Sequence, residues 1–600
     1  MNAMSQDSPL SDATSTAAIP DGTVILENAC GMAVVDLRGA RVVSWRPHGT
    51  GEAFGAGGLA CPDPAVMLCR FHVAGRRDVN RFWSELSLVG EVGPLRLSVL
   101  VRLAGGLSVA VSATNSTDEM AVFRASLAAS FAVSDPARCL FEDLATTFRV
   151  EGLPQPDVAP DYRLASPSAR FFLRDPVARR VFIMSGAGAN CVRATSSASV
   201  EYAADDRGAE SRLLSPGIPR TVMLSISIRD EAAMPIDASG LRRETGDLQG
   251  RIDALAASGG GTLSIPPGVH LSGALFFKPG VNLHLEEGAV LLGAGDAADY
   301  PMRETRVGCR TLHYYPALVN ADHCDGFRIS GPGIIDGNGL SVWREFWKGW
   351  KGMDMEWRRN TDGVLVRPRL VYVSNSNGVE IADATLRDSR RWTLHLYRCR
   401  NAVIRDCRIE CRVLDGVHGP STDAIDLDAC SHVAVRRVFM NVNDDGVVLK
   451  GGRGPWADDP VRHPENGPTS DVLVEDCVFG TYCHSCLTLG SECIGAERVV
   501  VRRCLADQPG NLVHIKMRTD THFTYRDILV EDCLGILHTG ITALPWTQFA
   551  DLEGRTDLPR SLVENVKIHC PALHAERTEN CETPDYCDIR GISIDLGGSN

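Results

Sequence analysis

The stretch from Ser421 to Lys450, STDAIDLDACSHVAVRRVFMNVNDDGVVLK, joins a repeating strand pattern to a group of acidic residues. Asp423 precedes the pair Asp444 and Asp445 by 21 and 22 residues, which is about the length of one coil in a stacked β-solenoid. Adjacent coils pair as parallel strands about 4.8 Å apart, so one turn of the chain would bring these carboxylates together. Such a cluster suits glycoside hydrolysis, in which one carboxyl protonates the leaving oxygen and another activates water.

Related segments recur along the second half of the chain, at intervals of 23, 31, 39, 27, 29 and 33 residues. Each contains an apolar residue, two polar residues and another apolar residue, as expected for a short strand that turns a corner. One unit cannot bury its own apolar face, whereas stacked units form a continuous core. We therefore predict a right-handed parallel β-helix. The segments are IADATL at Ile381, IRDCRI at Ile404, VRRVFM at Val435, VEDCVF at Val474, VRRCLA at Val501, VEDCLG at Val530 and VENVKI at Val563.

Cys407, Cys477, Cys504 and Cys533 share one position of this repeat. The spacing predicts an internal ladder of small hydrophobic side chains rather than redox chemistry. The chain has 20 cysteines, but it is far larger than a small disulfide-stapled scaffold. We expect these cysteines to be mostly reduced and buried.

Composition narrows the class of protein. The formal net charge of the 600 residues is −14 and no basic tract stands out, which argues against a nucleic-acid partner. The N-terminal segment MNAMSQDSPLSDATSTAAIPDG has no basic region followed by an apolar core, so no secretory signal is expected. No apolar run is long enough to span a bilayer. We expect a cytoplasmic protein.

The first part of the chain has a different pattern. Short runs such as LRLSVLVRL, LSVAVSAT and TVMLSISI alternate apolar and polar residues, which predicts antiparallel sheets packed as a β-sandwich. The fold class is therefore all-β. The predicted divisions are a disordered tail at 1–21, the sandwich at 22–230, a linker at 231–246 and the β-helix at 247–600.

A short helix is expected where the β-helix begins. Leu248, Ile252 and Leu255 fall at i, i+4 and i+7. This helix would cover the open end of the solenoid, whose exposed strand edges otherwise invite aggregation.

The segment 337–362 is rich in tryptophan. Trp343, Trp347, Trp350 and Trp357 lie within fifteen residues, among Arg and Lys. Two interpretations are open: an apolar stripe packed on the solenoid, or a lid whose aromatic faces stack on sugar rings, with cations nearby for acidic groups.

From Leu248 to about residue 570 the chain resembles glycoside hydrolase family 28, the polygalacturonase family. The order and spacing of several motifs agree, which is far more specific than any single match. The matching segments are IDALAASGGGTLSIPPGVHLSGALFFKPGVNLHLEEGAVLLG, IIDGNG, RPRLVYV, SRRWTLHLYRCRNAVIRDCRI, STDAIDLDAC, NVNDDGVVLKGG, CHSCLTLGSE and LVHIKMR.

The acidic motifs of the family are N-T-D and D-D, followed by G-H-G. Asp423 matches the Asp of the first motif, with Ser421 in place of Asn, and Asp444 and Asp445 match the D-D pair. His484 matches the central His, although Cys and Ser replace the flanking glycines.

The resemblance assigns these four residues catalytic roles. It implies inversion by single displacement, with Asp444 as the general acid. Crowding by the other carboxylates would raise the pKa of Asp444. Asp423 and Asp445 would hold and deprotonate water, and His484 would tune an acid.

The last motif, R-I-K, is changed. Lys516 matches the Lys, but His514 stands where the family has Arg. Lys516 is expected to bind substrate, and Arg518 would replace the missing cation because residues 514, 516 and 518 share one face of a strand. Trp392 and His395 fall where the family lines its cleft, although a packed structural pair is equally compatible with RWTLHL.

The resemblance implies a glycosidase acting on pectin-type, galacturonate-containing oligo- or polysaccharides, with no cofactor. A cytoplasmic address and the tryptophan-rich segment favour exo action. Two alternatives stay open: a parallel β-helix polysaccharide lyase, or a carbohydrate-binding protein that has lost catalysis. Cys483, His484, Cys486 and Cys493 resemble a zinc set, but the His has a catalytic counterpart, so we expect no metal.

The sandwich weakly resembles the galactose-mutarotase superfamily. The similar fragments are GARVVSWRP, TNSTDEM and SFAVSD. The His and Glu that face one another in those epimerases have no assignable counterpart here. We expect a structural, non-catalytic sandwich, with a second active site as the alternative.

Overall fold

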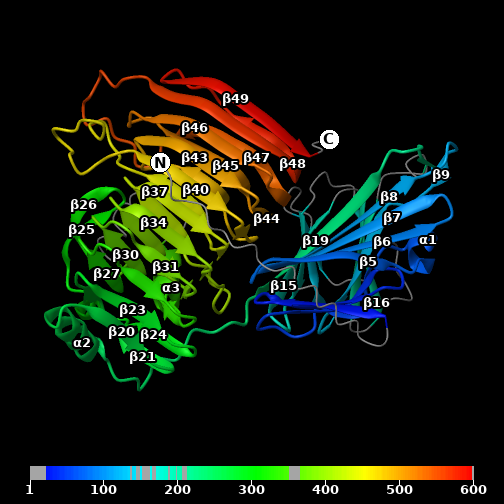
Figure 1. Ribbon diagram of the computed structural model, residues 1–600, viewed down its shortest axis with the longest axis horizontal. Coiled ribbons are helices and arrows are strands. Elements are labelled where there is room, and N and C mark those ends of the chain that lie inside the picture. The colour runs from blue at the N-terminus through cyan, green and yellow to red at the C-terminus, as the bar shows by residue number, and fades with distance from the viewer. Residues whose placement is uncertain are drawn as a thin grey trace.

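The computed structural model describes residues 22–135, 138–143, 149–151, 162–164, 170–186, 189–196, 199–205, 213–349 and 365–597. The predicted fold class is confirmed: an antiparallel β-sandwich precedes a large parallel β-helix (Figure 1). The tail at 1–21, Trp350 and Trp357 lie outside the described residues. No described helix combines the length and apolar character needed to cross a membrane.

Two antiparallel sheets form the sandwich within the described residues. In β7, side chains alternate between the core and the outside, as the sequence pattern predicts. The first sheet contains, in spatial order, β1 (Thr23–Asn28), β2 (Gly31–Asp36), β3 (Arg41–Pro47), β4 (Phe54–Ala60), β10 (Ser126–Ala132), β17 (Ser199–Asp205), β16 (Ala189–Ser196) and β13 (Tyr162–Leu164). The second contains β12 (Arg149–Glu151), β11 (Leu140–Asp143), β14 (Arg170–Asp175), β15 (Arg180–Gly186), β19 (Arg220–Asp230), β8 (Leu107–Asn115), β7 (Leu95–Leu103), β6 (Trp83–Val92) and β5 (His72–Asn80). Smaller elements are α1 (Pro64–Leu68) and the pair β9 (Ala121–Val122) and β18 (Leu213–Leu214).

The β-helix has three parallel sheets, called sheets 1 to 3. Sheet 1 consists of β20 (Gly261–Ile265), β23 (Val281–Leu285), β28 (Arg328–Ser330), β31 (Glu380–Ala382), β34 (Arg400–Arg405), β37 (Ser431–Arg436), β40 (Thr469–Glu475), β43 (Gly495–Arg502), β46 (Thr524–Glu531), β48 (Ser561–Cys581) and β49 (Cys587–Gly597). Sheet 2 consists of β21 (Gly268–Ser272), β24 (Ala289–Gly293), β29 (Ile334–Asp336), β32 (Thr385–Arg387), β35 (Arg408–Glu410), β38 (Phe439–Asn441), β41 (Val478–Phe479), β44 (Leu505–Asp507) and β47 (Leu534–Trp546). Sheet 3 consists of β22 (Leu275–Phe277), β27 (Val319–Asp322), β30 (Val371–Ser374), β33 (Leu394–Tyr397), β36 (Ile425–Asp428), β39 (Val447–Lys450), β42 (Ser485–Leu489), β45 (Asn511–Arg518) and the end of β47. A hairpin of β25 (Arg303–Val307) and β26 (Arg310–Tyr314) leaves the coils.

The repeat predicted from the sequence pairs in register through Val530. Ile404 pairs with Val435, and Val501 pairs with Val530. The third residue of each unit takes a left-handed conformation, for example Asp406 at φ 55°, which turns the chain out of sheet 1 at the corner. The last unit was wrongly aligned, because Val530 pairs with Ile568 and not with Val563. The reason is that the left-handed third residue of this unit, Asn565 (φ 56°), is the counterpart of Asp527 (φ 58°) within β46 and not of the corner residue Asp532 (φ 53°).

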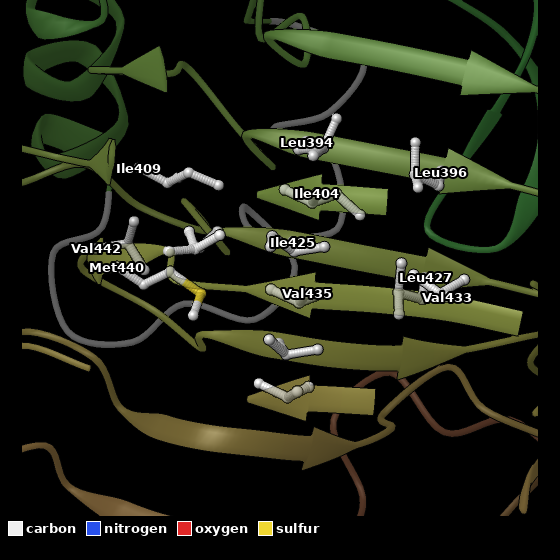
Figure 2. Packing of buried hydrophobic residues seen from close by; sticks show 14 of the residues in the cluster. Leu394, Leu396, Ile404, Ile409, Ile425, Leu427, Val433, Val435, Met440 and Val442 are labelled. Carbon is white, nitrogen blue, oxygen red and sulfur yellow. The ribbon is translucent and has the colours of Figure 1, made fainter. Parts of the chain in front are cut away.

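Apolar side chains from all three sheets fill the interior of the β-helix. Ile404 and Val435 of sheet 1 lie near Leu394 and Ile425 of sheet 3 (Figure 2). The predicted cysteine ladder is buried in this core, together with Cys570 at its end. Burial raises the pKa of the Cys407 thiol to about 12, so this thiol stays protonated and unreactive. The 19 cysteines whose side chains the structure describes are free.

The helix predicted at the start of the β-helix forms, and part of the tryptophan-rich segment is also helical. α2 (Thr245–Ala257) buries Leu248 and Ile252 against the first coil, at the green end of the β-helix in Figure 1. α3 (Leu340–Gly349) buries Trp343, whose Nε1 donates to the Ser389 carbonyl at 3.0 Å. For Trp343 the interpretation as a packed apolar stripe is therefore correct.

The sandwich packs against the β-helix through the outer face of its second sheet. Phe82 lies against Phe439, with ring centroids 5.8 Å apart, inside a buried apolar cluster shared by both domains. Close by, the Ser185 hydroxyl donates to the Gln508 side chain at 2.7 Å in a buried hydrogen bond. β15 is accordingly buried on both faces. These contacts fix the position of the sandwich beside the coils.

Candidate active site

A cleft of about 900 Å³ lies between sheet 3 of the β-helix and the sandwich. Five of the predicted site residues lie together in the lining of this cleft, as expected if each turn of the chain forms one coil. Four of them precede strands of sheet 3, and the fifth lies within β45. These residues are Asp423, Asp444, Asp445, His484 and Lys516.

Backbone pairing between coils sets the positions of the carboxylates. Asp423 stands two residues before Ile425 and Asp445 two residues before Val447, and these two strand residues are paired. The Ala424 N–H donates to the Asp445 carbonyl at 2.9 Å. Asp423 and Asp445 therefore occupy equivalent places on neighbouring coils.

The same pairing places His484 one coil further along. Its N–H donates to the Asp444 carbonyl at 2.9 Å, and its Nδ1 lies 3.6 Å from the Asp444 carboxylate. The His484 side chain is 64 % exposed, whereas that of Asp444 is 24 % exposed. Burial opposes protonation of His484, but the nearby Asp444 carboxylate outweighs it and raises the pKa of the imidazole.

Among the three clustered aspartates, Asp423 is the carboxyl whose neutral form is favoured. Burial, followed by the charges of Asp444 and Asp426, raises the pKa of its carboxyl well above the ordinary value. Burial also raises the pKa of the neighbouring Asp426, to about 7. A proton shared within the cluster is therefore favoured on these two buried carboxyls.

The expected raised pKa of Asp444 is wrong for the unliganded protein. Burial favours the neutral acid, but the nearby His484 imidazole and the charge of Lys516 outweigh it and lower the pKa of Asp444. Crowding does raise the pKa of one carboxyl, as expected, but that carboxyl is Asp423.

Lys516 forms an ion pair with the third carboxylate, that of Asp445. Its Nζ donates to Asp445 at 2.6 Å and lies 5.0 Å from the centroid of the Trp546 ring. Burial of Asp445 opposes ionisation, but Lys516 outweighs it and lowers the pKa of this carboxyl. Asp445 is thus a stable carboxylate, suited to accept a proton or a hydrogen bond from water.

Lys450 is a cleft residue that the sequence reasoning missed. This buried ammonium lies 3.1 Å from Glu492, 3.5 Å from Asp426 and 3.9 Å from Asp423. It also stands 4.2 Å from the centroid of the Trp392 ring. The available signal was a lysine at the outward position of the otherwise apolar strand VVLK.

Two predicted substrate-binding residues do not reach the cleft lining. His395 is fully buried behind Trp392, and its ring nitrogens face Asp428 and Arg369. Arg518 is also buried, because Asp520 binds its guanidinium through two hydrogen bonds of 2.7 and 2.8 Å. The proposed replacement of the family cation by Arg518 is therefore wrong.

Trp392 and His514 do line the cleft. Burial, followed by the charge of Lys516, lowers the pKa of His514 to about 4. The imidazole is neutral at pH 7. The position at which the family carries an arginine is therefore uncharged in this chain.

Three side chains could in principle hold a metal ion. Ligand atoms of Asp444, Asp445 and His484 all lie within 4.8 Å of one another. Lys516 already places an ammonium on Asp445, and this charge opposes binding of a second cation. In the described part of the chain, Cys483, Cys486 and Cys493 do not join His484 in such a group.

The cleft is basic although the protein is acidic. Eight Arg and Lys line it against five Asp and Glu, while the whole chain carries a formal charge of −14. One wall comes from the sandwich, and nothing in the sequence signalled it. The sandwich residues in the lining are Arg170, Phe172, Arg174, Ile183 and Arg229, together with Glu231 just after β19.

A parallel β-helix with three aspartates on neighbouring coils of one cleft is the arrangement that the motif resemblance implied. The profile described as "Glycosyl hydrolases family 28" matches residues 302–465, and the resemblance to this family is confirmed.

Individual proteins show how far the similarity extends. A "Probable polygalacturonase" from Vitis vinifera is 25% identical over 291 residues, 45% of this chain and 54% of that protein. The chain thus spans about half the length of this curated relative. The crystal structure of an exopolygalacturonase from Thermotoga maritima has a TM-score of 0.49 at 21% identity, covering 60% of this chain and 90% of that one. A putative mutarotase from Salmonella typhimurium resembles 34% of this chain, with 90% of its own chain covered, 10% identity and a TM-score of 0.28.

Proposed function

We propose that this protein hydrolyses glycosidic bonds in galacturonate-containing, pectin-type oligo- or polysaccharides, with inversion and from a chain end. The observation that carries the proposal is the cluster of Asp423, Asp444 and Asp445 in a cleft whose lining is more basic than the protein as a whole. A polyanionic substrate is attracted to such a cleft, and the carboxyls provide an acid and a base.

The proposed reaction uses three carboxyls that share one proton. In this scheme the proton starts on Asp423, whose raised pKa favours the neutral form and whose carboxyl lies beside that of Asp444. Transfer of that proton makes Asp444, the more exposed carboxyl, the general acid. It also leaves Asp423 ionised beside Asp445. Asp444 then protonates the glycosidic oxygen as the C–O bond breaks, while Asp423 and Asp445 take a proton from the water that attacks the anomeric carbon.

Exo action draws support from the second wall of the cleft. The sandwich and Trp347 of α3 stand opposite sheet 3, and Trp347 is held by a hydrogen bond from its Nε1 to the His418 carbonyl at 2.8 Å. A walled cleft favours short chains and chain ends over the middle of a long polymer.

The cytoplasmic location stays a prediction.

The proposal is tested by the products of the wild-type protein. Oligogalacturonates, rhamnogalacturonan fragments and neutral hexose oligosaccharides are incubated with it, and reducing sugar, ultraviolet absorbance and product anomer are followed. We expect release of mono- or disaccharides from oligogalacturonates, with inversion seen by NMR and no ultraviolet signal. Unsaturated, absorbing products would identify a lyase instead. Binding of all sugars without any cleavage would identify a carbohydrate-binding protein.

His484 sets the alkaline limit of activity in this scheme. The positively charged imidazole favours ionisation of the Asp423–Asp444 pair, so its removal raises the pKa at which the pair loses its shared proton. We expect His484→Ala to lower kcat and to move the alkaline limb of the pH profile upward by about one pH unit. The measurement is kcat/KM against pH. An alkaline limb that moves downward would contradict this account of the proton.

A further inference from the structure

The strand β14 of the sandwich presents alternate side chains to the cleft. Phe171, Leu173 and Asp175 of this strand are buried in the sandwich. The intervening residues point the other way, as the two-residue period of a strand requires. These outward residues are Arg170, Phe172 and Arg174, and all three line the cleft.

A second strand of the same sheet adds a guanidinium. Arg229 of β19 and Arg174 of β14 are both held by Glu231, at 2.5 and 2.9 Å. Glu142 also lies near Arg174, at 3.5 Å. Arg170 adds a third guanidinium to this wall of the cleft, and the carboxylates of Glu576 and Asp507 act on its charge.

The wall also contains polar atoms without partners. Arg229 stands over the ring of Tyr482, with its Cζ 6.0 Å from the ring centroid. Within the described residues, the Arg229 Nε and the Tyr482 Oη have no hydrogen-bond partner although both atoms are buried. Unsatisfied buried donors are costly. A carboxylate that enters between the sandwich and Tyr482 would supply the missing acceptor.

Contacts between the sandwich and the β-helix hold the wall in place. The hydroxyls of Ser227 in β19 and Thr481 in the cleft lining lie 2.8 Å apart. Arg170 donates to the Gln508 carbonyl at 2.6 Å. The guanidiniums are thus positioned before substrate arrives, which reduces the entropic cost of binding.

We infer that the sandwich forms a sugar-binding subsite of the catalytic cleft, in which Arg229 and Arg174 bind the carboxylate of one uronate residue of the substrate. This inference rests on the proposed hydrolysis of galacturonate-containing chains. The sandwich then acts as a specificity element, in addition to supporting the β-helix. It provides the positive charge that the neutral His514 no longer provides on sheet 3.

The test compares Arg229→Ala, Arg229→Lys and Arg96→Ala. Arg96 is an exposed arginine of the same sandwich, paired with Glu91 at 3.3 Å and 72 % exposed, and serves as the matched control. For trigalacturonate, loss of a charge-assisted hydrogen bond is expected to raise KM about tenfold or more in Arg229→Ala. We expect kcat to stay within about twofold, an intermediate KM in Arg229→Lys and no change in Arg96→Ala.

Methyl-esterified trigalacturonate separates recognition from a structural role. Because the ester has no negative charge, the wild type and Arg229→Ala should have the same KM for it. An unchanged KM for trigalacturonate, or an equal loss on both substrates, would overturn the inference.

Failure of the proposed function is recognised separately. If the wild type cleaves no oligogalacturonate, calorimetric titration of galacturonate into the same proteins tests the subsite alone. Weaker binding by Arg229→Ala than by Arg96→Ala supports the subsite, and equal binding refutes it.

Discussion

Replacing Asp444 by Asn is expected to reduce kcat on oligogalacturonates by about 10²–10⁴-fold, the usual contribution of a general acid. An amide donates a hydrogen bond but cannot transfer a proton to the leaving oxygen. Because the pKa of Asp444 is lowered in the folded state, its charge stabilises the fold at neutral pH, and we expect the Asn variant to unfold at a somewhat lower temperature than the wild type. Reducing-sugar release and thermal unfolding measure the two effects.

Substrates with different leaving groups test whether Asp444 is the general acid. An aryl galacturonide with an acidic phenol needs no protonation, so Asp444→Asn should retain most of its activity on that substrate. Asp445→Asn should lose activity on both substrates, because it removes a base that acts on water. The surface variant Asp557→Asn, in a side chain that is 79 % exposed, controls for the chemical change. Equal losses of Asp444→Asn on both substrates would exclude Asp444 as the acid.

Replacing Lys450 by Met is expected to destabilise the protein by about 3–5 kcal/mol, because it leaves buried carboxylates without their counter-charge. Burial of Glu492 favours its neutral form, but Lys450 and Arg453 outweigh it and hold its pKa below the usual range. A lowered acid pKa stabilises the folded state above the unfolded pKa of 4.5, and that stabilisation is lost as the pH falls through the folded pKa.

The Lys450→Met variant should therefore differ most from the wild type at neutral pH. The difference should shrink as the pH falls below about 4.5, where the unfolded carboxylate becomes protonated. Denaturant unfolding at pH 7 and pH 4 measures this. Lys278→Met is the matched control, since Lys278 forms a half-exposed pair with Asp253 at 2.7 Å and such pairs contribute about 0–1 kcal/mol. A loss that is equal at both pH values would contradict the proposed role of Lys450.

The errors in the sequence interpretation have local causes. Strand alternation correctly places residues 514, 516 and 518 on one face, but Asp520 turns the Arg518 guanidinium away from the cleft. The last repeat was misaligned because its left-handed residue, Asn565, matches Asp527 within β46 and not the corner residue Asp532. A pattern of apolar residues contains neither effect, since the first depends on a polar partner and the second on which of two left-handed positions a residue occupies.

The sequence by itself determined the repeat length of the coils. Its repeat length brings Asp423, Asp444, Asp445, His484 and Lys516 into one cleft, because the hydrogen bonds between parallel coils leave little freedom in register. Only the tertiary structure decided which carboxyl has a raised pKa, since this depends on burial and on charges from three coils. It alone also decided that the sandwich walls the cleft. Arg174 and Arg229 are more than 200 residues from Asp444 in the chain, and their contacts across the domain interface follow no periodic pattern.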